Sequence, residues 1–83
     1  MKILYFAWVR ERIGLGEEEV DPPVEIDTVG ALMTWLAGRG EVYAYAFENP
    51  KVVRAAIDRM HVKPTASIAG AREIAFFPPM TGG

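Results

Sequence analysis

Cysteine is absent from this 83-residue chain. Its absence excludes disulfides, zinc sites built on thiolates and a cysteine nucleophile. Histidine occurs once, as His61, and a lone histidine with no cysteine cannot complete a standard metal or nucleophile site. We therefore expect no bound metal, and we interpret His61 as a structural or surface residue.

A basic stripe is also missing, because the net charge is −2 and the lysines and arginines are scattered along the sequence. Nucleic-acid binding needs clustered cations for phosphate contacts, so we expect no nucleic-acid partner. The chain has no apolar run long enough to span a bilayer, and its N-terminus lacks a charged segment followed by a cleavage site. These features predict a cytoplasmic protein that does not engage a membrane.

Catalytic patterns are lacking as well. No spacing among Asp21, Glu25, Asp27 and Glu48 indicates a general acid and base. The segment Gly14-Leu15-Gly16 has neither the third glycine nor the lysine of a phosphate loop, so we interpret it as a turn. The sequence therefore predicts no active site on the domain itself and no cofactor-binding residues.

The N-terminal part of the chain has strand character. Residues 2–9 are apolar in both alternating sets, which predicts a strand covered on both faces. We interpret Glu17–Glu19 as a solvated acidic surface before a second strand at residues 20–26. Pro22-Pro23 would lie on an edge of the sheet or interrupt that second strand.

One helix is clearly indicated after Thr28, whose hydroxyl is a suitable N-cap. Apolar residues then follow at helical spacing, and glycines at positions 38 and 40 stop the helix. The apolar stripe consists of Val29, Leu32, Met33 and Leu36. Residues 41–50 are rich in aromatic side chains and fit either a short helix or a loop.

Strand character returns at residues 51–57 and 61–63 and, after a turn at 69–71, at residues 73–77. An apolar first strand, one main helix and an apolar last strand predict an α+β fold, with a mixed sheet curled around the helix. This is the β-grasp, or ubiquitin-like, arrangement, in which the first and last strands lie side by side at the sheet centre. The predicted core is Ile3, Tyr5, Leu32, Leu36, Ile74 and Phe76, and Phe6, Ala75 and Phe77 are left on the outer face.

The chain ends in Phe76-Phe77-Pro78-Pro79-Met80-Thr81-Gly82-Gly83. The two prolines supply no backbone N–H, so a flexible tail at 78–83 should leave a domain formed by residues 1–77. Six extended residues reach roughly 20 Å, and Gly82 and Gly83 can pass through a narrow channel. The terminal carboxylate is then the one group open to activation, through an adenylate and a thiocarboxylate.

Three segments carry a resemblance to a known family: the C-terminal octet, Phe6-Ala7-Trp8-Val9-Arg10-Glu11, and Thr28-Val29 at the start of the helix. In these segments, and over essentially its whole length, the chain resembles the small subunits of molybdopterin synthase, which are ubiquitin-like sulfur carriers. Two positions depart from the family pattern. His61 stands where the surface is usually apolar, and Ala71-Arg72 replaces acidic residues before the last strand.

The resemblance implies that an E1-like enzyme adenylates Gly83 with ATP and that a sulfur donor protein supplies the sulfur of a thiocarboxylate. The tail would then enter the large synthase subunit, in a heterotetramer, and give its sulfur to the cyclic pyranopterin precursor of molybdopterin. No cofactor would be bound permanently, and Gly82 would assist threading. The implied partner-binding residues are Phe6, Ala75, Phe77, Pro78, Pro79, Met80 and Thr81.

Two alternatives remain open at this point. A carrier or modifier of the same fold could serve thiazole synthesis, tRNA thiolation or protein conjugation. Alternatively, the outer sheet face could be a docking module with an inert tail, because most chain ends have no function.

Overall fold

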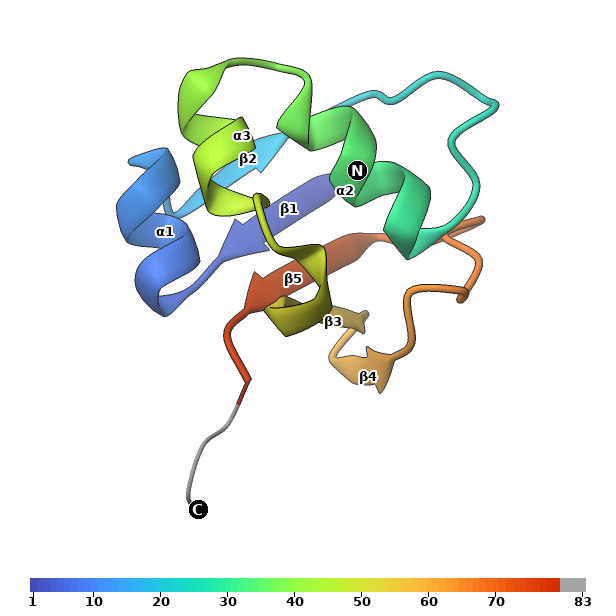
Figure 1. Cartoon of the computed structure of the whole chain (residues 1–83). Helices are drawn as coiled ribbons and strands as arrows, with labels where there is room; N and C mark the ends of the chain where they lie inside the picture. The colour runs from blue at the N-terminus through green and yellow to red at the C-terminus, as the bar shows by residue number, and fades with distance from the viewer. Residues whose placement is uncertain (80–83) are drawn as a thin grey trace.

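The computed structural model describes residues 1–79, which form a five-stranded mixed sheet with helices on one face (Figure 1). The strand order is β2-β1-β5-β3-β4, in which β1 and β5 are parallel and the other pairs antiparallel. The elements are β1 (Lys2–Tyr5), α1 (Ala7–Ile13), β2 (Glu17–Glu19), α2 (Val29–Ala37), α3 (Glu41–Ala46), a 3₁₀ turn (Pro50–Val52), β3 (Arg54–Ile57), β4 (Met60–Val62) and β5 (Glu73–Phe77). The β-grasp prediction is confirmed, including adjacent first and last strands.

The parallel register of β1 and β5 gives the sheet two distinct ends. Lys2 lies opposite Glu73 at one end, and Tyr5 lies opposite Phe76 at the other. The chain leaves β5 after Phe77, so we name the second end the tail end. The end that carries Lys2 and the N-terminus is named the far end.

The core lies between the sheet and the helices. All six predicted core residues are at most 1% exposed, which confirms that part of the prediction. Phe76 at the sheet centre meets the ring of Phe47 edge-on, with 5.3 Å between the ring centroids. This edge-to-face arrangement is one that aromatic pairs favour.

The first strand is shorter than predicted, and the extension to residue 9 is wrong. β1 ends at Tyr5, and the chain turns at Ala7, whose φ is +52°, into α1. Val9 and Ile13, four residues apart, are both buried from this helix, which ends at Gly14 in the left-handed conformation. An apolar run that satisfies alternation can therefore also supply the buried face of a short helix.

The second strand also differs from the prediction. Glu17–Glu19 forms β2, antiparallel to β1, whereas residues 20–26 are not a strand. Pro22-Pro23 offers no backbone N–H to a ladder, which explains why the strand does not extend there. A short, charged edge strand such as β2 also discourages pairing with other chains.

The remaining elements match the prediction more closely. Thr28 caps α2, accepting a hydrogen bond from the Ala31 N–H at 3.1 Å, and α2 ends before Gly38. The ambiguous segment at 41–50 forms helix α3 over its first six residues. Together with α1 and α2, this gives the described residues three α-helices rather than one main helix. β3 begins later than predicted because the 3₁₀ turn precedes it, β4 begins and ends one residue earlier, and β5 has the predicted bounds.

Candidate functional site

The candidate site is the tail end of the sheet, where β5 stops and the chain departs. Pro78 and Pro79 follow β5 directly, are partly exposed and belong to no helix or strand. The predicted site residues Met80, Thr81, Gly82 and Gly83 lie outside the described residues. The division into a domain at 1–77 and a tail at 78–83 therefore stays a prediction, as do the roles of the tail residues.

The outer face of the sheet, opposite the helices, leads to this exit. Side chains alternate along β5, so Ile74 and Phe76 enter the core while Ala75 and Phe77 lie half-buried on the outer face. Ala75 lies between Leu4 of β1 and Ala56 of β3. No helix among residues 1–79 covers this face, so Phe77 remains available to a partner.

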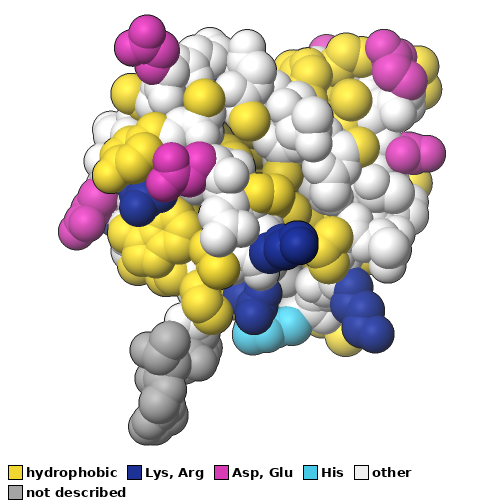
Figure 2. Space-filling model, viewed as in Figure 1, with side chains coloured by type: hydrophobic (Ala, Val, Ile, Leu, Met, Phe, Trp, Pro, Cys, Tyr) yellow, Lys and Arg dark blue, Asp and Glu magenta, His cyan; other side chains and the backbone are white. Residues whose placement is uncertain are grey.

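Phe6 lies at the same end, directly after β1. Its backbone N–H donates to the Phe76 carbonyl at 3.0 Å, which holds it beside the end of β5. Its side chain is 46% exposed, a large fraction for phenylalanine. Figure 2 shows hydrophobic side chains gathered above the point where the described chain ends. The structure thus brings Phe6 and Phe77 to one end of the sheet, as the sequence predicted.

His61 is also part of this surface. It lies opposite Ala56 in the β3–β4 pair, and its exposed ring contacts the Phe77 ring in a tilted arrangement, with 5.1 Å between centroids and an interplanar angle of 51°. The interpretation of His61 as a surface residue is confirmed. This contact limits the positions that the Phe77 ring can adopt and places a polar side chain beside it.

A cluster of Trp8, Arg12 and Tyr45 was missed at the sequence level. The Arg12 guanidinium carbon lies 4.5 Å from the Trp8 ring centroid and 4.1 Å from that of Tyr45, which ties α1 to α3. Arg12 also donates to the Tyr45 carbonyl at 3.1 Å and pairs with Glu48. The i,i+4 spacing of Trp8 and Arg12 would have been the signal, but only with α1 recognised as a helix.

Glu18 is an anchor of the fold rather than a solvated acid, which corrects the interpretation of that residue. Its carboxylate accepts hydrogen bonds from the hydroxyls of Tyr5 and Tyr43, both at 2.8 Å, and pairs with Arg39 at 3.1 Å. Its side chain is only 13% exposed. Burial, followed by the hydrogen bond to Glu18, raises the pKa of Tyr5 and of Tyr43 above the usual tyrosine range.

The described residues do not assemble a metal centre. No group of three or more His, Cys, Asp or Glu side chains among residues 1–79 could hold a metal ion. An open recess of about 290 Å³ lies at the far end, between Met1, the loop that follows β2, and Ile68. Within the same residues, no helix is long and apolar enough to cross a bilayer.

A mixed β-grasp sheet, helices on one face and a chain that exits beside a bare apolar face define a ubiquitin-like domain. The ThiS family model matches residues 3–83, so the chain belongs to the ThiS family. The chain is 37% identical to the molybdopterin synthase sulfur carrier subunit of Escherichia coli and 34% identical to that of Haemophilus influenzae, with 100% of this chain and 99% of each relative covered. It also superimposes on the crystal structure of SAMP1 from Haloferax volcanii, with a TM-score of 0.71 and 25% identity over 100% of this chain and 98% of that one.

Proposed function

We propose that this chain is the sulfur carrier subunit of molybdopterin synthase and acts in molybdenum cofactor biosynthesis. The observation that carries the proposal is the position of the exit: β5 ends at the sheet centre, next to an uncovered apolar face, and continues into Pro78-Pro79 and a terminal Gly82-Gly83. Two full-length relatives named as such carriers support it.

The chemistry takes place at the terminal carboxylate of Gly83. An E1-like enzyme transfers AMP from ATP to this carboxylate, which forms a mixed anhydride and releases pyrophosphate. A hydrosulfide-level sulfur, delivered by a donor protein, attacks the acyl carbon, forms the C–S bond and displaces AMP. The resulting thiocarboxylate is a stronger nucleophile than the carboxylate, and its sulfur attacks the cyclic pyranopterin precursor and displaces an oxygen substituent. Water then cleaves the acyl C–S bond, which leaves the sulfur on the precursor and restores the Gly83 carboxylate.

In this proposal the domain binds and positions, and the reaction occurs on the partners. The large synthase subunit provides the active site, and two copies of each subunit form the working heterotetramer in the cytoplasm. Phe6, Ala75 and Phe77 form the docking surface, because they lie at the exit and remain open to a partner. ATP is consumed by the activating enzyme and is not a resident cofactor of the carrier.

The test is intact-mass analysis of the chain after incubation with its activating enzyme, ATP and a sulfide source. We expect one terminal oxygen to be replaced by sulfur, and no change when ATP is omitted. The charged carrier, mixed with the large subunit and the cyclic precursor, should then yield molybdopterin. An unchanged mass would refute the carrier assignment in favour of a docking module. Thiocarboxylate formation without precursor conversion would instead favour a carrier for another pathway.

A further inference from the structure

Three cationic side chains gather at the tail end of the sheet, although the chain as a whole is acidic. Lys51, Arg54 and Lys63 are all exposed, and none of them forms an ion pair with a carboxylate among residues 1–79. Figure 2 shows Lys and Arg side chains grouped with the histidine on the face viewed. We call Lys51, Arg54 and Lys63 the basic rim.

The strand register places the basic rim beside the exit. Arg54 lies directly opposite Phe77 in the β3–β5 pair. Ala55 lies opposite Val62 in the β3–β4 pair, so Lys63, the next residue, follows at the same end. Arg54 also donates to the Lys51 carbonyl at 2.9 Å, which holds the third cation close by.

The other charges of the sheet are arranged differently. At the far end, Arg59 and Arg72 line an open recess together with Asp58 and Glu73, so cations and carboxylates are mixed there. The acidic residues of β2 lie at the opposite edge of the sheet from β4. Around Phe77, by contrast, three cations without a carboxylate partner stand together, whereas Arg59 and Arg72 share their recess with two carboxylates.

We propose that the basic rim docks against a carboxylate-rich protein surface bordering the cavity that receives the tail. This inference rests on the proposed function and names the chemistry of the partner. Any protein that seats Phe77 must also face Arg54, its direct cross-strand neighbour, and would leave three cations uncompensated unless it supplied carboxylates. Three cations are too few for stable binding to a nucleic-acid backbone. An adenylate on the terminal carboxylate is a less suitable partner, because an extended tail would hold it up to roughly 20 Å from the basic rim.

The physical role of the rim is to speed and orient the encounter. Exposed charges attract an oppositely charged surface over about 10 Å at moderate salt, and this attraction raises association rates far more than it slows dissociation. The apolar contact at Phe77 then determines how long the complex lasts. Salt should therefore weaken the contribution of the rim and leave that of Phe77 largely intact.

The experiment compares Lys51→Glu, Arg54→Glu, Lys63→Glu and the triple variant with Arg59→Glu. Arg59 is an exposed arginine in the turn between β3 and β4, and its reversal makes the same charge change at the far end. Association rates with the purified large subunit and with the activating enzyme are measured by stopped flow at low and high salt. For at least one of the two enzymes, we expect the triple variant to associate about tenfold more slowly at low salt, each single variant to fall between, and the differences to shrink at high salt.

If Arg59→Glu slowed association as much as the triple variant did, or if the triple variant did not slow it, the docking role of the basic rim would be refuted. Circular dichroism of each variant separates loss of docking from loss of folding. The proposal of a protein partner would also be refuted if the wild-type chain bound a single-stranded oligonucleotide tightly and the triple variant did not. Failure of the proposed function can be distinguished from failure of the rim proposal. In the first case the wild-type protein would gain no sulfur. In the second case sulfur transfer would remain intact and all variants would bind alike.

Discussion

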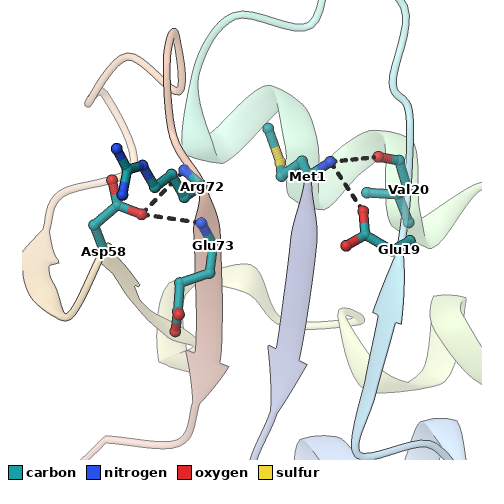
Figure 3. A network of polar contacts seen from close by, with 6 residues as sticks. All are labelled: Met1, Glu19, Val20, Asp58, Arg72 and Glu73. Atoms are coloured by element: carbon teal, nitrogen blue, oxygen red, sulfur yellow. Dashed lines mark hydrogen bonds and ion pairs between the residues drawn. The ribbon is translucent and has the colours of Figure 1, made fainter.

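The two ends of the sheet are stabilised in opposite ways. At the far end, polar ties join neighbouring segments (Figure 3): the N-terminal ammonium reaches a Glu19 carboxylate oxygen and the Val20 carbonyl, both at 3.2 Å. Asp58 Oδ1 accepts from the backbone N–H groups of Arg72 and Glu73 at 3.0 and 2.9 Å. The tail end instead presents Phe6, Phe77 and unpaired cations.

This difference indicates that the far end contributes to the stability of the fold and that the tail end is available for recognition of a partner. The hydrogen bonds at the far end hold β1 against β2 and β3 against β5. They also occupy polar groups that a partner could otherwise bind. At the tail end, Phe6 is exposed, Phe77 is half-buried, and the cations of the basic rim have no carboxylate partner within residues 1–79. Substitutions at the far end should therefore change stability alone, and substitutions at the exposed tail end should change binding or transfer.

The largest expected effect is on transfer. Deleting Gly83 should abolish sulfur transfer, because the shortened tail places its carboxylate one residue short of the activating site. Calorimetry with the large subunit should still detect binding, and thermal unfolding should match the wild type. Residual sulfur transfer comparable to the wild type would contradict the role of Gly83.

Phe76→Ala should produce the largest loss of stability. Phe76 is 0% exposed at the sheet centre, and removing a buried phenylalanine side chain costs about 3 to 5 kcal/mol. Urea unfolding followed by circular dichroism measures the change in the free energy of unfolding. A loss below about 1 kcal/mol would show that the core closes over the cavity.

Phe77→Ala, one residue along the same strand, should show the reverse pattern. We expect partner affinity to fall by about 2 kcal/mol or more, as for an aromatic anchor at an interface. The free energy of unfolding should fall much less than in Phe76→Ala, because Phe77 is only half-buried. Unchanged affinity by calorimetry would refute the anchor role.

Tyr5→Phe tests the buried phenol that donates to Glu18. Losing a hydrogen bond to a charged group should cost about 1.5 to 3 kcal/mol at neutral pH. The raised pKa of Tyr5 also predicts a pH dependence. Above about pH 10 the unfolded chain loses phenolic protons that the folded chain keeps, so wild-type stability falls there by up to about 1.4 kcal/mol per pH unit for each such tyrosine.

Below about pH 10 that contribution is fully present, since the phenol is protonated in both states. The variant should therefore lose less stability than the wild type between neutral and strongly alkaline pH. Chemical unfolding at matched pH values measures this difference, with Tyr45→Phe as an exposed control. Parallel stability curves for the wild type and Tyr5→Phe would contradict the assignment.

Asp58→Ala should have the smallest effect, a loss of about 1 kcal/mol from two partly exposed hydrogen bonds and a φ of +48° that alanine tolerates less well. Asp58→Asn keeps an acceptor oxygen and tolerates this backbone conformation, so it serves as the matched control. Both variants should bind the large subunit as the wild type does. A loss of binding would place part of the recognition surface at the far end.

The sequence predicted those elements whose signal is local. The stripe from Val29 to Leu36 has a single period and a recognisable cap, and β5 alternates between core and surface positions. α1 was missed because the turn into it occurs at Ala7, an ordinary residue with positive φ, where no glycine marks a break. β2 was missed because three glutamates have low strand propensity, and only pairing with β1 selects that conformation.

The candidate site likewise has one part that the local sequence predicts and one part that depends on strand pairing. Phe77 could be assigned to the outer face from alternation within its own strand. The grouping of Lys51, Arg54 and Lys63 depends on the registers of β3 with β4 and β5, which join residues distant in sequence. Such pairings are fixed by the whole sheet, so composition alone gave only scattered cations.

The position of β5 also links completion of the fold to completion of the chain. β5 is the last strand, yet it lies between β1 and β3 and joins two otherwise separate strand pairs. A chain released from the ribosome before residue 73 would lack the strand that joins the β2–β1 pair to the β3–β4 pair, and it would also lack the two terminal glycines. Under the proposed function, incomplete translation products would therefore not compete with finished carriers for the activating enzyme.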